Sequence, residues 1–433
     1  MKKVSLILDN PKRDKNYIIL IAMHLAKNNC EVTIVPTNMR HYELMHTEPD
    51  YVLYPHQRHK SSQEIAILNE SNIDIGVLET EQHVKEDYYL EYQTPKNISL
   101  LQNTVHMFSW GHNFSTILKK NSLYTEDQIK TVGNPKYDSY FFENMKPRDK
   151  TLKLLIGTGF GIANPKFISQ REQKKAFIKE NMSEQDYLSY YEVHQESLDK
   201  LIELVNSGFF PLDQEIELRP HPYEDEKIYK QKIKSVNIEN SKSIDEQLFS
   251  SESYVHYHST ASIDASVLMV PSINLAWFPV NHKLHGSTPF MEKISYQPSN
   301  MIEMKNLIDE IYTTGLKPKT NIKDKIFEEY LYKLDGKSHV RIANEILLQL
   351  NNKKKLPMKR FIKPFNNIKS IENSIKFRYA KKQWLKSAKK FEVGDITITL
   401  NYLNDLFNLN NQYNIEELFL NKLKLGSIKI SKQ

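Results

Sequence analysis

The chain has 433 residues, of which 39% are hydrophobic and 26% charged, with a formal net charge of +6. This length exceeds one ordinary domain, and the apolar fraction is sufficient for real hydrophobic cores. The single cysteine, Cys30, excludes a disulfide framework and a cysteine-based zinc site, and it fits a reducing cytoplasm.

The first half of the chain alternates predicted strands with predicted helices. The start, from Met1 to Asp9, predicts a strand and not a signal peptide, and no apolar run approaches the roughly 20 residues that span a bilayer. Alternation with short links predicts a parallel sheet covered on both faces, with one rim of loops at residues 9–14, 79–84 and 110–114. The predicted strands are residues 4–8, 31–36, 51–54, 73–78 and 104–108.

The second half repeats this alternation after a charged link at residues 146–150. Its first strand leads into a turn that contains Gly157 and Gly159, which permit close approach of the backbone to a ligand. The predicted strands are residues 152–156, 216–218, 236–238, 254–257 and 271–275, and the predicted helices are residues 170–206, 223–229, 244–248, 263–268, 301–313, 322–334 and 338–350.

We therefore expect an α/β fold with two Rossmann-like halves that meet near residue 145 and face each other across a cleft. The expected domains are residues 1–145, residues 146–350, and a basic, partly helical extension at residues 351–433.

Two strand-to-helix junctions in the second half predict a phosphate site. One carries Arg219, His221 and Pro222, and the other carries His258, Ser259 and Thr260. If the two strands are neighbours, both helix starts offer backbone N–H groups and positive dipole ends to one anion, and the side chains add donors. The alternatives are a buried histidine between two prolines, a solvated salt bridge of the arginine, and ordinary helix capping by the hydroxyls.

The order of several short motifs resembles bacterial surface-carbohydrate biosynthesis proteins of the two-domain GT-B glycosyltransferase type, over about residues 1–345. More distantly, the His-Pro and Ser-Thr pairs resemble those of bacterial sialyltransferases and capsule Kdo transferases. The motifs are at residues 8–14, 78–81, 110–111, 132–138, 163–167, 219–222 and 258–260.

The resemblance implies that the His-Pro and Ser-Thr loops hold the phosphate of a CMP-activated sugar, while an acidic pair supplies the base. Glu81, with Glu79 as the second candidate, stands where that acidic pair is expected, and Gln82 and His83 replace the two glycines that usually follow. A carboxylate there would take the proton of the acceptor hydroxyl. The alternative is a helix cap or an ion pair with Lys85.

Further polar residues are candidates for the acceptor side of the site. These are Asp9, Asn10, Lys12 and Arg13 after the first strand, and His112 on the same rim. They fit an acceptor pocket, but they equally fit a turn, a helix start and a structural histidine. We expect Asp138 to be a helix cap.

We expect neither a cofactor nor a metal, the substrate being a nucleotide sugar. The chain lacks an Asp-x-Asp sequence of the kind that metal-dependent sugar transferases use. His256 and His258 alternate along a predicted strand without a third ligand nearby.

The segment from Lys353 to Lys390 is dense in Lys and Arg and interleaved with aromatic residues, and Glu372 is its one acid. This composition suits an anionic membrane surface, or a solvated helical face. Nucleic acid would be attracted by the same charge. The glycosyltransferase resemblance favours the membrane and predicts a peripheral protein on the cytoplasmic face of the inner membrane, with a glycan or lipid-linked acceptor and no nucleic-acid partner.

Three functions remain open. The first is transfer of Kdo or a nonulosonic (sialic-type) acid from a CMP donor during capsule or lipopolysaccharide synthesis. The second is a CDP-polyol phosphotransferase or UDP-hexose transferase of the same fold, and the third is a non-enzymatic accessory protein docked to the membrane.

Overall fold

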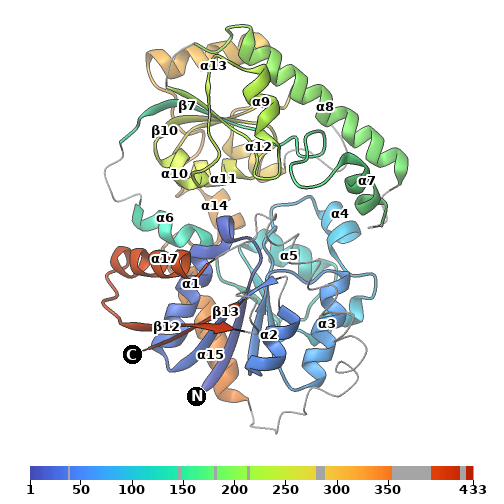
Figure 1. Cartoon of the computed structure of the whole chain (residues 1–433), viewed down its shortest axis with the longest axis vertical. Helices are drawn as coiled ribbons and strands as arrows, with labels where there is room; N and C mark the ends of the chain where they lie inside the picture. The colour runs from blue at the N-terminus through green and yellow to red at the C-terminus, as the bar shows by residue number, and fades with distance from the viewer. Residues whose placement is uncertain are drawn as a thin grey trace. The chain divides into compact units, whose positions relative to one another are not determined.

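The computed structural model describes residues 1–37, 40–143, 149–179, 183–211, 215–278, 288–353, 392–419 and 426–432. The chain divides into a first unit of Met1–Met145 with Lys325–Gln433, and a second unit of Lys146–Asp324 (Figure 1). The division near residue 145 agrees with the expected one. The second unit ends at Asp324 and not at residue 350, because the helices that follow pack in the first unit.

The first unit is built on a sheet of eight strands in the order β12-β13-β2-β1-β3-β4-β5-β6. The strands from β2 to β6 pair in parallel, and β13 pairs antiparallel with β2. The strands are β1 (Lys2–Leu8), β2 (Cys30–Pro36), β3 (Tyr51–Tyr54), β4 (Asp74–Leu78), β5 (His106–Ser109), β6 (Ile129–Thr131), β12 (Tyr413–Phe419) and β13 (Gly426–Lys432).

Both faces of this sheet are covered, as the alternation of strands and helices predicts. Val4, Leu6 and Leu8 pack with apolar residues of α1, α15 and α17, whereas Ile7 points into a second core with residues of α2, α3 and α5. The helices are α1 (Pro11–Lys27), α2 (Arg40–Thr47), α3 (His59–Glu70), α4 (Glu86–Tyr88), α5 (His112–Lys120), α6 (Asp138–Glu143), α14 (Lys325–Leu331), α15 (Ser338–Asn352) and α17 (Val393–Leu406).

The end of the chain differs from the expectation. Residues 396–400 alternate like a strand, yet they lie in α17, whose buried residues Ile396, Thr399, Leu400 and Leu403 follow helical spacing. Burial against α1 therefore determines that these residues form a helix and not a strand. The hairpin of β12 and β13, red in Figure 1, extends the sheet beside the blue first strands.

The second unit has a parallel sheet of five strands in the order β11-β10-β7-β8-β9. Leu154 and Ile156 of β7 share a core with residues of α8 and α13. The predicted helical region 170–206 forms two helices. The strands are β7 (Leu152–Gly157), β8 (Ile216–Arg219), β9 (Asn237–Ile238), β10 (Ser251–His256) and β11 (Ser272–Asn274); the helices are α7 (Gln170–Lys179), α8 (Glu184–Asn206), α9 (Glu226–Lys232), α10 (Ile244–Phe249), α11 (Ala261–Val267), α12 (Pro289–Ile294) and α13 (Met301–Thr313).

Each sheet has one point at which the strand order reverses. In the first unit the chain places β2 on one side of β1 and β3 on the other, and in the second unit β8 and β10 flank β7. Ligands of open α/β sheets bind outside the carboxyl ends of the strands at such points. The loops after β1, β3, β7 and β10 are therefore the places to look for a site.

Within the part of the chain that the structure describes, no helix is long and apolar enough to cross a membrane. The predicted membrane-binding segment, Lys353 to Lys390, lies outside the described residues apart from Lys353 itself.

Candidate functional site

The predicted phosphate-binding loops of the second unit follow β8 and β10, which are not neighbouring strands. Each of them pairs with β7. This corrects the expected strand order, and it places the glycine-containing loop after β7 between the two others. The carboxyl ends of these parallel strands bring Gly157, Gly159, His221, Ser259 and Thr260 to one edge of one sheet.

His221 is exposed in the loop between β8 and α9. Its backbone N–H donates to the hydroxyl of Thr158 at 3.1 Å, and its Nδ1 accepts from the N–H of Tyr223 at 3.3 Å. Desolvation by the surrounding protein and the charge of Arg219 lower the pKa of His221 to about 4. The imidazole is therefore neutral at pH 7, and because Nδ1 accepts, Nε2 carries the proton and can donate to an anion.

The second predicted loop places its hydroxyls at the start of α11. Thr260 is the N-cap residue, is exposed and makes no side-chain cap bond, whereas Ser259 Oγ accepts from the N–H of Ala261 at 3.2 Å. His258 is buried, has a φ of 41° and donates its N–H to Asn274 Oδ1 at 2.9 Å. The strand ends at His256, so the predicted alternation of His256 and His258 along one strand is wrong.

The predicted helix after Pro222 begins three residues later than expected. Asp225 is the N-cap of α9, and its side chain accepts from the N–H of Lys227 at 3.0 Å. The side chain of Asp225 thus already caps this helix start. The donors available to an anion on this side of the site are therefore those of the loop before α9, and His221 is the central one.

Arg219 is buried at the end of β8. Its Nη1 donates to the carbonyl of Lys242 at 2.7 Å and to Gln247, which in turn donates to Glu217. Burial lowers the pKa of Arg219, and nearby Tyr254 and acidic residues oppose this effect. Through these hydrogen bonds Arg219 links the end of β8 to α10 and to the residues before it.

The two candidate glycines have different surroundings. A Cβ atom at Gly157 would lie 2.3 Å from the hydroxyl of Tyr254, so this glycine makes room for a side chain of the neighbouring strand β10. A Cβ atom at Gly159 would meet only the carbonyl of Tyr257, at an ordinary 3.5 Å. Packing within the protein therefore requires a glycine at position 157 but not at 159.

The acidic pair of the first unit lies after β4 and has one buried and one exposed member. Glu79 is 1% exposed, whereas the side chain of Glu81 is 48% exposed. Burial raises the pKa of Glu79 to about 7, Glu81 contributes in the same direction, and Arg58 opposes both. Glu81 Oε2 accepts from Arg58 at 3.1 Å and from Gln93 at 3.3 Å, and Arg13 lies 3.8 Å from Oε1.

The acceptor-side candidates after β1 belong to the same charged cluster. Arg13 pairs with Asp14 at 2.6 Å and with Asp9 at 3.5 Å, while Asp9 also accepts from Thr37 at 3.2 Å. Asn10 is the N-cap of α1 and accepts from the N–H of exposed Lys12 at 3.1 Å. The helix-start interpretation therefore holds for Asn10, and Arg13 links the first loop to Glu81.

His112 starts α5 and is exposed, with its ring 5.4 Å from that of Tyr332. Gly111 before it is in close contact with α14, since a Cβ atom there would lie 2.3 Å from the backbone of Tyr330. His112 thus lies where α14 crosses the rim, outside the contacts that join Arg13, Arg58 and Glu81.

Sequence reasoning missed four residues that join the predicted ones. Arg58 and Asp14 complete the charged cluster in the first unit, and Thr158 and Glu224 join the loops of the second. The sequence carries a signal for Arg58. It follows the predicted strand at residues 51–54, so the carboxyl-end rule places it on the same rim as the loops at residues 9–14 and 79–84. Glu224 falls within the predicted helix at residues 223–229, which favours its interpretation as an acid in the first helical turn.

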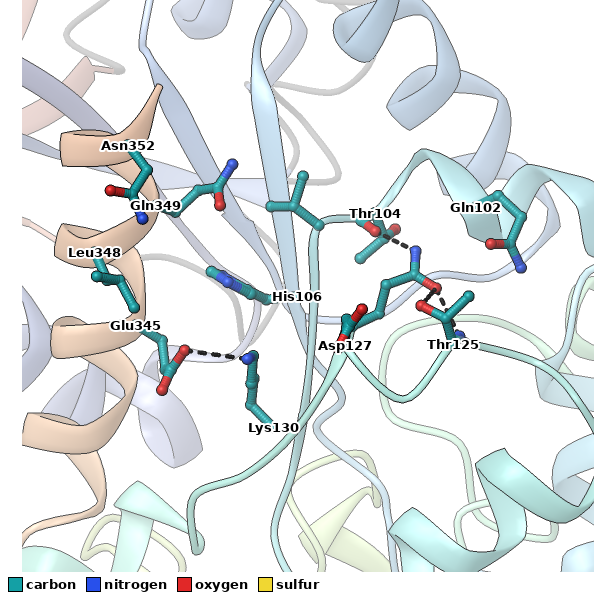
Figure 2. Close-up of a pocket in the computed structure, with 12 residues that line it drawn as sticks. Gln102, Thr104, His106, Thr125, Asp127, Lys130, Glu345, Leu348, Gln349 and Asn352 are labelled. Carbon is teal, nitrogen blue, oxygen red and sulfur yellow. Dashed lines mark hydrogen bonds and ion pairs between the residues drawn. The ribbon is translucent and has the colours of Figure 1, made fainter. Parts of the chain in front are cut away.

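A cavity of about 450 Å³ opens at the opposite, amino-terminal edge of the first sheet (Figure 2). His106, Lys130 and Glu345 are among its lining residues, and Lys130 lies 3.5 Å from Glu345. Burial, with a smaller effect of Lys130, lowers the pKa of His106 to about 4. None of the predicted site residues lines this cavity.

Among the described residues, no group of three or more His, Cys, Asp or Glu side chains is placed to hold a metal ion.

No protein-family model matches the sequence, and no curated protein matches it either. Among solved structures, the chain is similar to the UDP-GlcNAc 2-epimerase of Methanocaldococcus jannaschii in complex with UDP-GlcNAc and UDP. The TM-score is 0.51 at 13% identity, over 80% of this chain and 99% of that one. The UDP-GlcNAc 2-epimerase of Neisseria meningitidis bound to UDP-GlcNAc gives a TM-score of 0.50 at 13% identity, over 80% of this chain and all (100%) of that one.

The chain has a GT-B fold. Its two Rossmann-like domains correspond to the two units, and each carries one set of the residues described above. In this GT-B chain the first unit is discontinuous, because α14, α15, α17 and the final hairpin return to it. A shared fold leaves the reaction to be argued from the sites.

Proposed function

We propose that the protein is a nucleotide-sugar-dependent glycosyltransferase of surface polysaccharide biosynthesis. It transfers Kdo or a nonulosonic (sialic-type) acid from a CMP-activated donor to a glycan or lipid-linked acceptor of capsule or lipopolysaccharide. The observation that carries the proposal is that His221, Gly159 and Thr260 lie on the loops after three adjacent strands, β8, β7 and β10, at the carboxyl end of the second sheet. The similar GT-B structures of the 2-epimerases were solved with UDP-GlcNAc, which supports a nucleotide sugar as the substrate class.

On the donor side, the loops of the second unit bind the nucleotide phosphate. The neutral ring of His221 donates from Nε2, Thr260 adds an exposed hydroxyl, and Gly159 leaves its backbone open to close approach. As the bond between the sugar and the phosphate oxygen breaks, negative charge grows on the departing nucleotide. Donors fixed in advance stabilise that charge.

On the acceptor side, Glu81 takes the proton of the attacking hydroxyl while the new bond to the sugar forms. Its exposure makes it accessible to substrate, and Arg13 and Arg58 hold it in position. Glu79 lies buried in the same loop and is not exposed enough for this role. A base must reach the proton that it removes, so exposure favours Glu81.

A second candidate is a UDP-hexose enzyme of the same fold, which the bound UDP-GlcNAc of the two similar structures favours. A CDP-polyol phosphotransferase would use the same donors for its phosphates. The donor nucleotide therefore separates the candidates, while the fold does not.

Thermal-shift titration of the wild type with CMP, CDP and UDP tests the proposal. We expect the largest stabilisation with CMP, because CMP is the nucleotide of the proposed donor. A ligand raises the melting temperature when it binds the folded protein and not the unfolded chain. His221→Ala should abolish that shift, and Glu81→Ala should keep it while turnover falls by at least a hundredfold. Preference for UDP or CDP would favour the second candidates, and no shift with any nucleotide would favour a non-enzymatic protein.

We further propose that the basic segment from Lys353 to Lys390 binds the anionic inner face of the membrane. Each cation near such a surface contributes about 1 kcal/mol. Deletion is an unsuitable test, since α17 and β13 follow the segment and pack on the first unit. Substituting its lysines with glutamine should abolish sedimentation with phosphatidylglycerol vesicles and leave the CMP shift unchanged; retained sedimentation would refute the assignment.

A further inference from the structure

Glu224 is a fully buried carboxylate of the loop after β8 that binds the loop after β7 at the proposed phosphate site. It is 0% exposed and accepts hydrogen bonds from the hydroxyl of Thr158 at 2.6 Å, from the N–H of Phe160 and from the hydroxyl of Tyr229. Burial raises its pKa to about 7, and these donors oppose that rise. A buried carboxylate costs stability unless its oxygens are satisfied, and here several donors converge on them.

These contacts connect the loop after β7 to the loop after β8. Thr158 donates to Glu224 and accepts the N–H of His221 at 3.1 Å, so one hydroxyl joins the carboxylate to the backbone of the candidate phosphate ligand. Next to it, the N–H of Lys166 donates to the carbonyl of Tyr223 at 2.8 Å, and Pro165 forms an isolated bridge with Glu224. Buried contacts thus fix the two loops to each other, while the side chain of His221 remains exposed.

We infer that Glu224 is a positioning residue of the donor site, which through Thr158 holds His221 and the loop at residues 158–160 in their binding geometry. This inference rests on the proposed nucleotide site. Above pH 7 the ionised carboxylate of Glu224 suits the role because it only accepts, and Thr158, Phe160 and Tyr229 all donate to it. In Glu224→Gln the new amide N–H₂ faces one of these donors, so the network must rearrange although the side-chain volume is unchanged.

The test compares CMP affinity by calorimetry in full-length variants at a temperature where all are folded. Glu224→Gln and Thr158→Val should each weaken binding at least tenfold, and the double variant should lose little more than either single one, because both break one connection. Thr158→Ser keeps the hydroxyl and should bind like the wild type. In turnover, KM for the donor should rise while kcat changes less than twofold.

The matched control is Ile308→Ala, which removes a buried side chain of α13 from the core of the same unit, at a position outside both loops. It should lower the melting temperature and leave CMP affinity intact. If it weakens CMP binding as much as Glu224→Gln, or if Glu224→Gln binds CMP normally, Glu224 does not position the site.

Amide hydrogen exchange separates this inference from the proposed function. Without nucleotide, the segments around Phe160 and His221 should exchange faster in Glu224→Gln and Thr158→Val than in Thr158→Ser; equal exchange would overturn the inference. A wild type that binds none of the nucleotides would instead overturn the proposed function, whatever the exchange shows.

Discussion

Two glutamates in one short loop, Glu79 and Glu81, show how environment divides the roles of identical side chains. Glu79 is buried beneath the rim and has a pKa raised to about 7, mainly by burial. Glu81 is exposed and lies between Arg13 and Arg58. The pair therefore consists of one accessible carboxylate and one buried carboxylate whose ionisation the fold opposes.

The buried glutamate predicts a pH dependence of stability. A pKa of about 7 in the folded state, against an ordinary 4.5, means that the protonated form is favoured by folding. The contribution of Glu79 to stability is thus complete below pH 4.5 and is lost as pH rises through 7, a difference of about 3 kcal/mol. Glu79→Gln removes this pH-dependent loss. The free energy of urea unfolding should therefore fall less between pH 5 and pH 8 for the variant than for the wild type.

Glu70→Gln on the exposed end of α3 is the control for this measurement. It should show the same decline as the wild type between the two pH values. A Glu79→Gln variant whose decline equals that of the wild type would mean that Glu79 ionises in the folded protein as freely as in the unfolded chain.

At the scale of elements, a buried carboxylate of the first unit binds the start of α15, the helix that returns to this unit late in the chain. Asp138, at the start of α6, accepts from the N–H groups of Ser338 and His339 at 3.0 and 2.7 Å and from the ring of His339 at 2.7 Å. Asp138 was expected to be a helix N-cap, yet it is the first residue of α6, and its carboxylate instead accepts from the first N–H groups of α15, far along the sequence, whose N-cap residue is Lys337. Gly133 fits the same junction, with a φ of 88° and Ser338 within 2.5 Å of a Cβ atom placed there.

Removing this cap should destabilise the first unit. Asp138→Ala leaves the N–H groups of Ser338 and His339 buried without an acceptor, and we expect a loss of about 2–4 kcal/mol in the free energy of unfolding. Asp138→Asn keeps one acceptor oxygen and should fall between the alanine variant and the wild type. Urea unfolding followed by circular dichroism measures both; an alanine variant as stable as the wild type would show that water replaces the carboxylate.

The sequence predicts elements well where burial is uniform and poorly where burial depends on distant partners. The strand at residues 51–54 is observed with the expected bounds, because a short apolar run buried on both faces has no competing period. Residues 396–400 alternate like a strand but form a helix, since their partners on α1 are distant in sequence. Short strands such as β6 have too few residues to show any period.

The candidate site was predictable to the same degree. The carboxyl-end rule finds the loops that contain His221, Thr260 and Glu81, because it needs only the order of strands and helices. It cannot give the lateral order of strands, so β7 was not expected between β8 and β10. Nor can it distinguish a buried Glu79 from an exposed Glu81, because that difference arises from tertiary packing.

At the scale of the whole molecule, the two units differ in how their cores are assembled. The core of the second unit draws on residues from Leu154 to Leu316, all within one continuous stretch. The first unit needs two separate stretches, residues 1–145 and 325–433, since residues of α15, α17 and β13 pack on α1 and β2. These returning residues include Ile342, Ile346, Leu350, Ile396, Leu400, Leu403, Ile428 and Ile430.

This difference predicts how fragments of the chain behave. A fragment of residues 146–324 should fold alone, with a cooperative urea transition, because its core is complete. A fragment of residues 1–145 should show no cooperative transition, because α1 and the edge strand β2 lose the apolar partners that α15, α17 and β13 provide, and unburied apolar surface of that kind favours aggregation. Joining residues 1–145 to 325–433 through a short Gly-Ser linker should restore the transition. Circular dichroism and light scattering on the three fragments decide the matter: a cooperative, monomeric 1–145 fragment would show that the returning elements add to a domain that is already complete.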